Sequence, residues 1–203
     1  MPRKNTIRHD SADTFYHIYN CGNNKSNLFL DDSDYRYFEM LLGRGLSSKK
    51  SFDKFSRQYP NFSDGVELHA YCLMPDHFHL LLYQNDVSEI NKFMRSVGTA
   101  YSMYFNKKHK RTGQLYESRF KAIQIQPDER LEHISRYIHL NPISYMTYAH
   151  SSYSDYIYSP RDWVTTEFIL KRFKTPKLYA DFIADYEGAN KANDKYLQEI
   201  GEI

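Results

Sequence analysis

Two histidines separated by a single residue, His77 and His79, are the sharpest candidates for chemistry in this sequence. On a β-strand, residues i and i+2 project to the same face, so the two imidazoles would lie side by side while Phe78 points into the core. Neutral imidazole nitrogens bind first-row divalent ions and leave further coordination positions open for oxygen ligands. The tripeptide suggests half of a divalent-metal site, and a chance pairing on a solvated strand is the alternative.

A second group of polar side chains lies along a predicted helix that ends near residue 140. His133, Tyr137 and Asn141 are spaced four residues apart, so they share one stripe of that helix. A phenol and an amide oxygen one turn apart can face the same metal ion, and Tyr137 would then be placed to attack a phosphate. The alternative is that Tyr137, one of 19 tyrosines, only packs on a helix flank. An apolar stripe runs beside these residues: Leu131, Ile134 and Ile138.

The charge of the chain is unevenly distributed. The formal net charge is +2, but residues 89–121 carry eight basic and two acidic side chains, a net +6 that leaves −4 elsewhere. A local basic patch on a nearly neutral protein favours binding to a polyanion, with a solvated helix end as the alternative. The clustered cations that would contact a nucleic-acid backbone are Lys107, Lys108, Lys110 and Arg111. Three tyrosines in or near this region could stack on unpaired bases, with packing in the core as the alternative: Tyr101, Tyr104 and Tyr116.

These residues must be positioned by elements in the order β-α-β-β-α-β-α. Alternation and turn residues predict strands over 15–19, 66–73, 77–83 and 115–126. Capping and helical periodicity predict helices that start at Asp31 or Asp32, at Ser88 and at Pro127-Asp128, the last ending near Leu140 before Pro142. The first six elements follow the ferredoxin-like split βαβ pattern, an α+β fold with an antiparallel sheet and helices on one face.

The composition of the chain outside these elements indicates two further segments, residues 144–203 and residues 47–64. Residues 144–203 are rich in Tyr and Ser and then helical near 164–173 and 177–186, so we interpret them as a C-terminal extension packed on a core of residues 1–143. Residues 47–64 form a polar insertion without an assigned role. With 41% apolar residues, global disorder is excluded. Two cysteines cannot form a disulfide framework, and the apolar runs are too short for a membrane span, so we expect a cytoplasmic protein.

Three ordered motifs carry a resemblance to a known family. They are Met74–Leu81 (MPDHFHLL), Gly113–Lys121 (GQLYESRFK) and Arg136–Pro142 (RYIHLNP). Together they resemble the REP-associated tyrosine transposases, relatives of the single-tyrosine insertion-sequence transposases in the HUH endonuclease superfamily. Tyr16–Asn24 and Asp34–Phe38 are similar to the first strand, loop and helix of that family. The resemblance covers about residues 12–143.

The resemblance implies a role for each matching residue. His77 and His79 would hold Mg²⁺ or Mn²⁺, Asn141 would be a third ligand, and Tyr137 would be the catalytic tyrosine. Arg119 and Lys121 in the basic motif would contact phosphates. Two departures stand out. Cys21 replaces an arginine that is frequent in the family, and no tryptophan precedes Ser151-Ser152-Tyr153.

The implied function is a single-stranded DNA endonuclease and strand transferase, a transposase that cleaves near hairpin DNA through a 5′-phosphotyrosine. Two alternatives remain: a catalytically silent nucleic-acid-binding regulator, and a metal-dependent phosphodiesterase that uses water while Tyr137 is structural. The implied partner is single-stranded or hairpin DNA, with no membrane. Whether the chain works as a monomer or a dimer stays open at this point.

Overall fold

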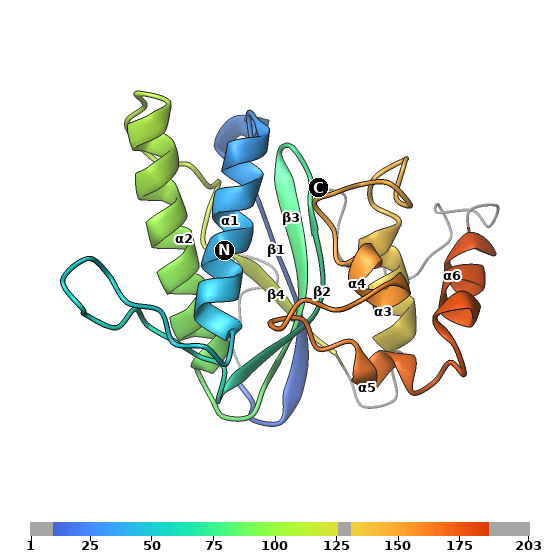
Figure 1. The fold of residues 1–203 in the computed structure, drawn as a ribbon. Coiled ribbons are helices and arrows are strands. Elements are labelled where there is room, and N and C mark those ends of the chain that lie inside the picture. Colours follow the sequence, from blue (N-terminus) through green and yellow to red (C-terminus); the bar gives the residue numbers. More distant parts are fainter. Residues whose placement is uncertain (1–9, 126–130, 187–203) are drawn as a thin grey trace.

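The computed structural model of the chain describes residues 10–125 and 131–186. A four-stranded sheet in the order β2-β3-β1-β4 lies at its centre, and every neighbouring pair of strands is antiparallel. Helices lie on both sides of this sheet (Figure 1). The strands are β1 (Thr14–Cys21), β2 (Val66–Leu73), β3 (His77–Gln84) and β4 (Lys121–Gln124). The helices are α1 (Asp32–Leu46), α2 (Glu89–Lys108), α3 (Leu131–His139), α4 (Tyr153–Ile157), α5 (Glu167–Leu170) and α6 (Pro176–Ala184), and η1 (Asn23–Lys25) is a single 3-10 turn.

Helices α1 and α2 pack on the first face of the sheet (Figure 1). Alternation along β3 directs Phe78 and Leu80 to this face, where both are buried. Helix α1 begins where the carboxylate of Asp31 accepts hydrogen bonds from the backbone N–H groups of Ser33 and Asp34. Four-residue spacing gives α2 a continuous buried stripe: Phe93, Val97, Tyr101 and Phe105.

The second face of the sheet is covered by α3 and by the helices that follow it. Leu81 of β3 meets Ile134 and Ile138 of α3 in one buried cluster, which also contains aromatic rings from residues 145–183. The chain after α3 also pairs with the outer edge of β2. The Leu73 N–H donates to the His150 carbonyl at 2.9 Å, and Cys72 forms a bridge with Ser151. The C-terminal segment therefore covers a sheet edge that would otherwise expose unpaired backbone groups.

This architecture confirms the α+β ferredoxin-like prediction, with α1 and α2 together on one face. The predicted strand over 115–126 is wrong in length, because β4 contains only four residues. The Asn20 side-chain amide donates to the Ser118 carbonyl at 3.1 Å, which interrupts regular pairing between β1 and the chain before Lys121. Residue 126 and the predicted helix start at Pro127-Asp128 lie outside the described residues.

The C-terminal helices differ in extent from the prediction. Helix α5 covers four residues of the expected 164–173 segment, α6 ends at Ala184, and α4 was not expected. Helix α3 ends at His139, because the residue before Pro142 is disfavoured in the helical conformation. The division into a core of residues 1–143 and an extension of residues 144–203 stays a prediction.

Within the described residues, we find no helix with the length and apolar character that crossing a bilayer requires.

Candidate active site

His77 and His79 lie on the second face of the sheet, at the start of β3. Their ring centroids are 5.1 Å apart and their planes are nearly perpendicular. The His79 side chain is fully buried, whereas that of His77 is 16% exposed. The alternation of the strand thus brings both imidazoles to one face, as the spacing predicts, and places them at the boundary between core and solvent.

Each of the two imidazoles has a partner on its Nδ1 atom. His77 Nδ1 lies 2.7 Å from Asp76 Oδ1, and its Nε2 lies 3.1 Å from Asn141 Oδ1. His79 Nδ1 lies 2.8 Å from His17 Nε2, a contact between β3 and β1. These contacts leave the Nε2 atoms of both histidines as the candidate ligand atoms, with the Asn141 amide beside one of them.

Burial controls the protonation of this group. Burial lowers the pKa of His79 well below the ordinary 6.5, and the neighbouring imidazoles of His17 and His77 lower it further. Burial also lowers the pKa of His17 to about 3. Both imidazoles are therefore neutral near pH 7, the form that presents a nitrogen lone pair to a metal ion.

Tyr137 lies across from these imidazoles. Its ring centroid is 5.4 Å from that of His79 and 5.8 Å from that of His17, and both contacts are edge-on. Tyr137 is half-buried, since the neighbouring residues Ile134 and Ile138 anchor α3 on the sheet. The helix that carries Tyr137 and the strand that carries the imidazoles thus share one site, although Tyr137 lies 58 positions after His79 in the sequence.

The residues present fit a divalent cation. Among the described residues, His79 Nε2 is a buried nitrogen with no hydrogen-bond partner, and such an atom is costly unless a ligand satisfies it. His77 Nε2 and Asn141 Oδ1 supply a second nitrogen and a neutral oxygen nearby. Two imidazoles and one amide oxygen leave positions open for water and phosphate oxygens, as a catalytic metal site requires.

The other two histidines of α3 have separate surroundings. His139 is fully buried, with Nδ1 at 2.8 Å from Tyr179 Oη and Nε2 at 2.7 Å from Ser152 Oγ, so it joins α3 to the C-terminal segment. His133 is exposed, and its Nδ1 accepts a hydrogen bond from the Arg136 guanidinium at 2.8 Å. His139 is thus a packing residue in this arrangement. The Nδ1 lone pair of His133 already accepts the hydrogen bond from Arg136.

The predicted DNA-binding cations do not form one cluster. Lys121 lies above the Tyr19 ring, 5.5 Å from its centroid, and β1 brings Tyr19 to within 6.0 Å of the His79 ring. Arg111 lies above the Phe105 ring at 5.4 Å. The remaining exposed cations are Lys107, Lys110 and Arg119. Of the predicted phosphate contacts, Lys121 is thus the one that the structure brings beside the histidines.

Lys108 takes part in an internal ion-pair network. Its Nζ lies 2.6 Å from Asp31 Oδ1 and 2.7 Å from Asp34 Oδ1, and His109 Nε2 lies 2.9 Å from Asp34 Oδ2. Asp31, Asp34 and His109 have the mutual spacing of metal ligands. The Lys108 ammonium already neutralises the same carboxylate oxygens, so this group joins the N-terminus of α1 to the C-terminus of α2.

The aromatic candidates are mostly used in packing. Tyr101 is fully buried and donates to the Leu28 carbonyl at 2.6 Å, so it belongs to the core. Tyr104 stacks on Tyr37, with ring centroids 3.7 Å apart. Tyr116 has a buried hydroxyl and lines a cavity of about 800 Å³ between α2 and residues 116–120. That cavity also has Arg95 and Arg119 in its wall, so it combines aromatic and cationic groups.

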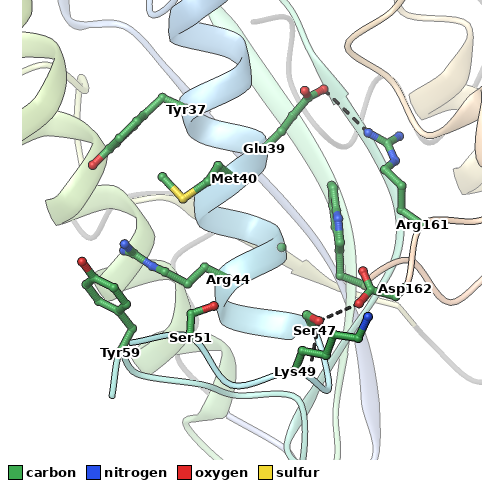
Figure 2. A pocket seen from close by; sticks show the side chains of 12 residues that line it. Tyr37, Glu39, Met40, Arg44, Ser47, Lys49, Ser51, Tyr59, Arg161 and Asp162 are labelled. Carbon is green, nitrogen blue, oxygen red and sulfur yellow. Dashed lines mark hydrogen bonds and ion pairs between the residues drawn. The ribbon is translucent and has the colours of Figure 1, made fainter. Parts of the chain in front are cut away.

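A second hollow, about 740 Å³, lies along the outer side of α1 (Figure 2). Arg44 and Tyr59 face each other in it, with the guanidinium 4.0 Å from the ring centroid, and Ser47 donates to Asp162 at 2.7 Å. None of the histidines of the candidate active site lines this hollow. It is therefore separate from the proposed chemistry.

Sequence reasoning did not identify His17 and Asp76 as functional residues. Both residues lie in motifs that carry the resemblance, Asp76 in Met74–Leu81 and His17 in Tyr16–Asn24, but neither was given a role. Alternation places His17 on the same face as Tyr19, and the predicted split βαβ pattern puts β1 beside β3, but neither gives the register that brings His17 to His79. The contact between His17 and His79 spans 62 positions and depends on that strand order.

Comparisons with known proteins identify the family and the fold of this chain. Residues 11–141 match the family described as "Transposase IS200 like". A solved structure of a REP-associated tyrosine transposase bound to a REP hairpin is similar to this chain, with a TM-score of 0.56 and 14% sequence identity. The match covers 80% of this chain and 92% of that one, and at this identity it supports the fold alone. Comparison with curated proteins gives no match.

Proposed function

Because the chain belongs to the IS200-like transposase family, we propose that it cleaves and rejoins single-stranded DNA with Tyr137 as nucleophile and a divalent metal as cofactor. The observation that carries this proposal is the position of the Tyr137 ring, 5.4 Å from that of His79, on the face where Asn141 contacts His77. Two separate sequence motifs, Met74–Leu81 and Arg136–Pro142, thus meet at one site.

The proposed reaction is a transesterification. The Tyr137 oxygen forms a bond to phosphorus, the bond from phosphorus to the 3′-oxygen breaks, and a 5′-phosphotyrosine remains. The phenol loses its proton and the leaving oxygen gains one, so a 3′-hydroxyl is released. Because one phosphate ester replaces another, rejoining needs no external energy source.

His77 and His79 would hold Mg²⁺ or Mn²⁺ through their Nε2 atoms, and Asn141 would hold the ion through Oδ1. The ion, when bound, polarises a non-bridging phosphate oxygen and offsets negative charge in the transition state. The edge-on packing of Tyr137 against His79 and His17 restricts the ring to one orientation, which favours in-line attack.

The proposed substrate is a DNA hairpin with a single-stranded flank. The relative in the solved structure is bound to a REP hairpin, and hairpin recognition by this chain is part of the proposal. Lys121 beside the site and the cations Lys107, Lys110, Arg111 and Arg119 would contact the backbone. The cavity beside Arg95 and Tyr116 offers a further surface of suitable chemistry.

A covalent-adduct experiment tests the proposal. The protein is mixed with labelled hairpin oligonucleotides from the host genome and Mn²⁺, and the products are separated on a denaturing gel. We expect a shifted protein–DNA band that disappears in Tyr137→Phe. The matched control is Tyr158→Phe, because Tyr158 is 82% exposed and lies far along the chain from the site, and this variant should keep the band.

Other outcomes identify the alternatives. Cleavage that survives Tyr137→Phe, without an adduct, would indicate a phosphodiesterase that uses water. Tight binding of hairpin DNA with neither adduct nor cleavage would indicate a silent nucleic-acid-binding protein. A band that persists in Tyr137→Phe would assign the nucleophile to another residue.

A further inference from the structure

We propose that His17 is a positioning residue that holds His79 in the tautomer with a bare Nε2, and so prepares His79 to bind the metal ion. The inference rests on the proposed function for its role in catalysis. Its physical content, the location of one proton, can be measured on the metal-free protein. His17 does not act as a ligand here, because its Nε2 faces Nδ1 of His79 and not the open side of the site.

The geometry joins the two imidazoles closely. On β1 and β3, His17 pairs with Leu81 and Tyr19 pairs with His79, so His17 and His79 are diagonal neighbours on one face. Their rings are nearly parallel, with centroids 5.0 Å apart, and the two nitrogen atoms are 2.8 Å apart. That separation is a full hydrogen bond, and one of the two nitrogens must carry the proton between them.

The position of that proton decides whether His79 can bind a cation. If Nδ1 of His79 carries it, Nε2 keeps a free lone pair. If Nε2 of His17 carries it, a neutral His79 must be protonated on its own Nε2, which leaves a buried N–H without a partner and blocks coordination. Among the described residues, no hydrogen-bond partner reaches His79 Nε2, so a bound cation can satisfy this atom only in the first arrangement.

The neighbouring histidine is held in a comparable way. Asp76 Oδ1 lies 2.7 Å from His77 Nδ1, and a carboxylate can only accept, so the proton on Nδ1 of His77 is also held by an acceptor. His79 is fully buried, and the group at its Nδ1 is the imidazole of His17, so His17 supplies the acceptor instead. In both candidate ligands, the nitrogen that faces away from the proposed metal position, Nδ1, thus contacts another side chain of the protein.

Variants at position 17 can separate hydrogen bonding from packing. His17→Phe keeps an aromatic ring in contact with His79 and Tyr137 but removes the acceptor. His17→Gln places an amide oxygen near the former position of Nε2 and can still accept from Nδ1 of His79. A purely structural role predicts that Phe is tolerated better than Gln, and a positioning role predicts the reverse.

The experiment is ¹⁵N NMR of histidine-labelled, metal-free protein, with His79 assigned by its loss in His79→Asn. Two-bond correlations report which ring nitrogen carries the proton. We expect Nδ1–H in the wild type and in His17→Gln, and Nε2–H or a mixture in His17→Phe. Mn²⁺ affinity, measured by electron paramagnetic resonance, should fall about 10- to 100-fold in His17→Phe and less than about 3-fold in His17→Gln.

Two results would overturn the inference. One is a wild-type His79 protonated on Nε2, which needs no variant to fold. The other is a His17→Phe protein that keeps both the wild-type tautomer and wild-type Mn²⁺ affinity. A wild type with Nδ1–H on His79 that binds no Mn²⁺ would instead contradict the metal step of the proposed function, while supporting the tautomer assignment.

Discussion

The Asn141 side-chain oxygen lies 3.1 Å from Nε2 of His77, across 64 positions of sequence. This contact joins the end of the helix that carries Tyr137 to the strand that carries the two histidines. If both atoms serve one cation, the helix end and the strand end are held together by the ion as well as by packing. Metal affinity and the position of Tyr137 are then linked.

Replacement of Asn141 tests this link. We expect Asn141→Ala to weaken Mn²⁺ binding about 10-fold or more, because an oxygen ligand is lost, whereas Asn141→Asp should bind at least as tightly as wild type. Titration followed by electron paramagnetic resonance measures both. Asn106→Ala is the matched control, because Asn106 donates only to the Gly113 carbonyl at a remote turn. Equal affinity in all three variants would remove Asn141 from the ligand set.

Lys108 and Lys107 should behave differently, although they are adjacent. Lys108→Met leaves the fully buried Asp34 carboxylate without its ammonium partner, so we expect unfolding free energy to fall by about 1–3 kcal/mol. Lys107→Met should leave stability nearly unchanged, because Lys107 is exposed. Urea denaturation compares them. In DNA-binding titrations at several salt concentrations, the slope of log affinity against log salt concentration should become shallower by about one for Lys107→Met.

The opposite pattern would contradict the structural assignment. Unchanged stability in Lys108→Met would mean that the ion pairs with Asp31 and Asp34 contribute little. A salt dependence that changes only in Lys108→Met would mean that this lysine leaves its partners to contact DNA.

His139 should be required for folding and not for chemistry. In His139→Phe, the hydroxyls of Tyr179 and Ser152 lose a buried partner, so we expect a loss of about 2–4 kcal/mol in unfolding free energy. Thermal denaturation and adduct formation at low temperature are the two measurements. A variant that is as stable as wild type but forms no phosphotyrosine would instead assign His139 a catalytic part.

Cys21 should react slowly with alkylating reagents. Burial raises the pKa of its thiol to about 11, and the hydrogen bond from Sγ to Glu117 Oε2 at 3.1 Å raises it as well. Only the thiolate reacts, so at pH 8 the rate should be roughly 100-fold below that of a free cysteine and should rise with pH through 11.

Glu117→Gln removes the carboxylate that raises the pKa of Cys21 by its hydrogen bond and its charge, and leaves burial in place, so it should accelerate the alkylation of Cys21 by several-fold without reaching the rate of a free thiol. Iodoacetamide kinetics in a Cys72→Ser background measure this rate at one site. A rate that is independent of pH between 8 and 10 would show that access to the thiol, and not its ionisation, limits the reaction.

Several features of the site follow from local sequence alone. Alternation places His77 and His79 on one face of a strand, and the four-residue spacing of Ile134 and Ile138 orients the helix that carries Tyr137. Asp31 caps α1 as its position predicts. Side-chain direction in strands and helices depends on backbone geometry, which a few neighbouring residues determine. The family motifs then imply that these elements meet.

Other features were decided by tertiary structure. The partnership of His17 with His79 requires β1 to lie beside β3, and the internal use of Lys108 requires the ends of α1 and α2 to meet. The shortness of β4 depends on where the Asn20 amide finds its acceptor. Each of these contacts joins residues more than 60 positions apart. Local propensity carries no information about them, because they form only when burial of the whole core selects one packing of the elements.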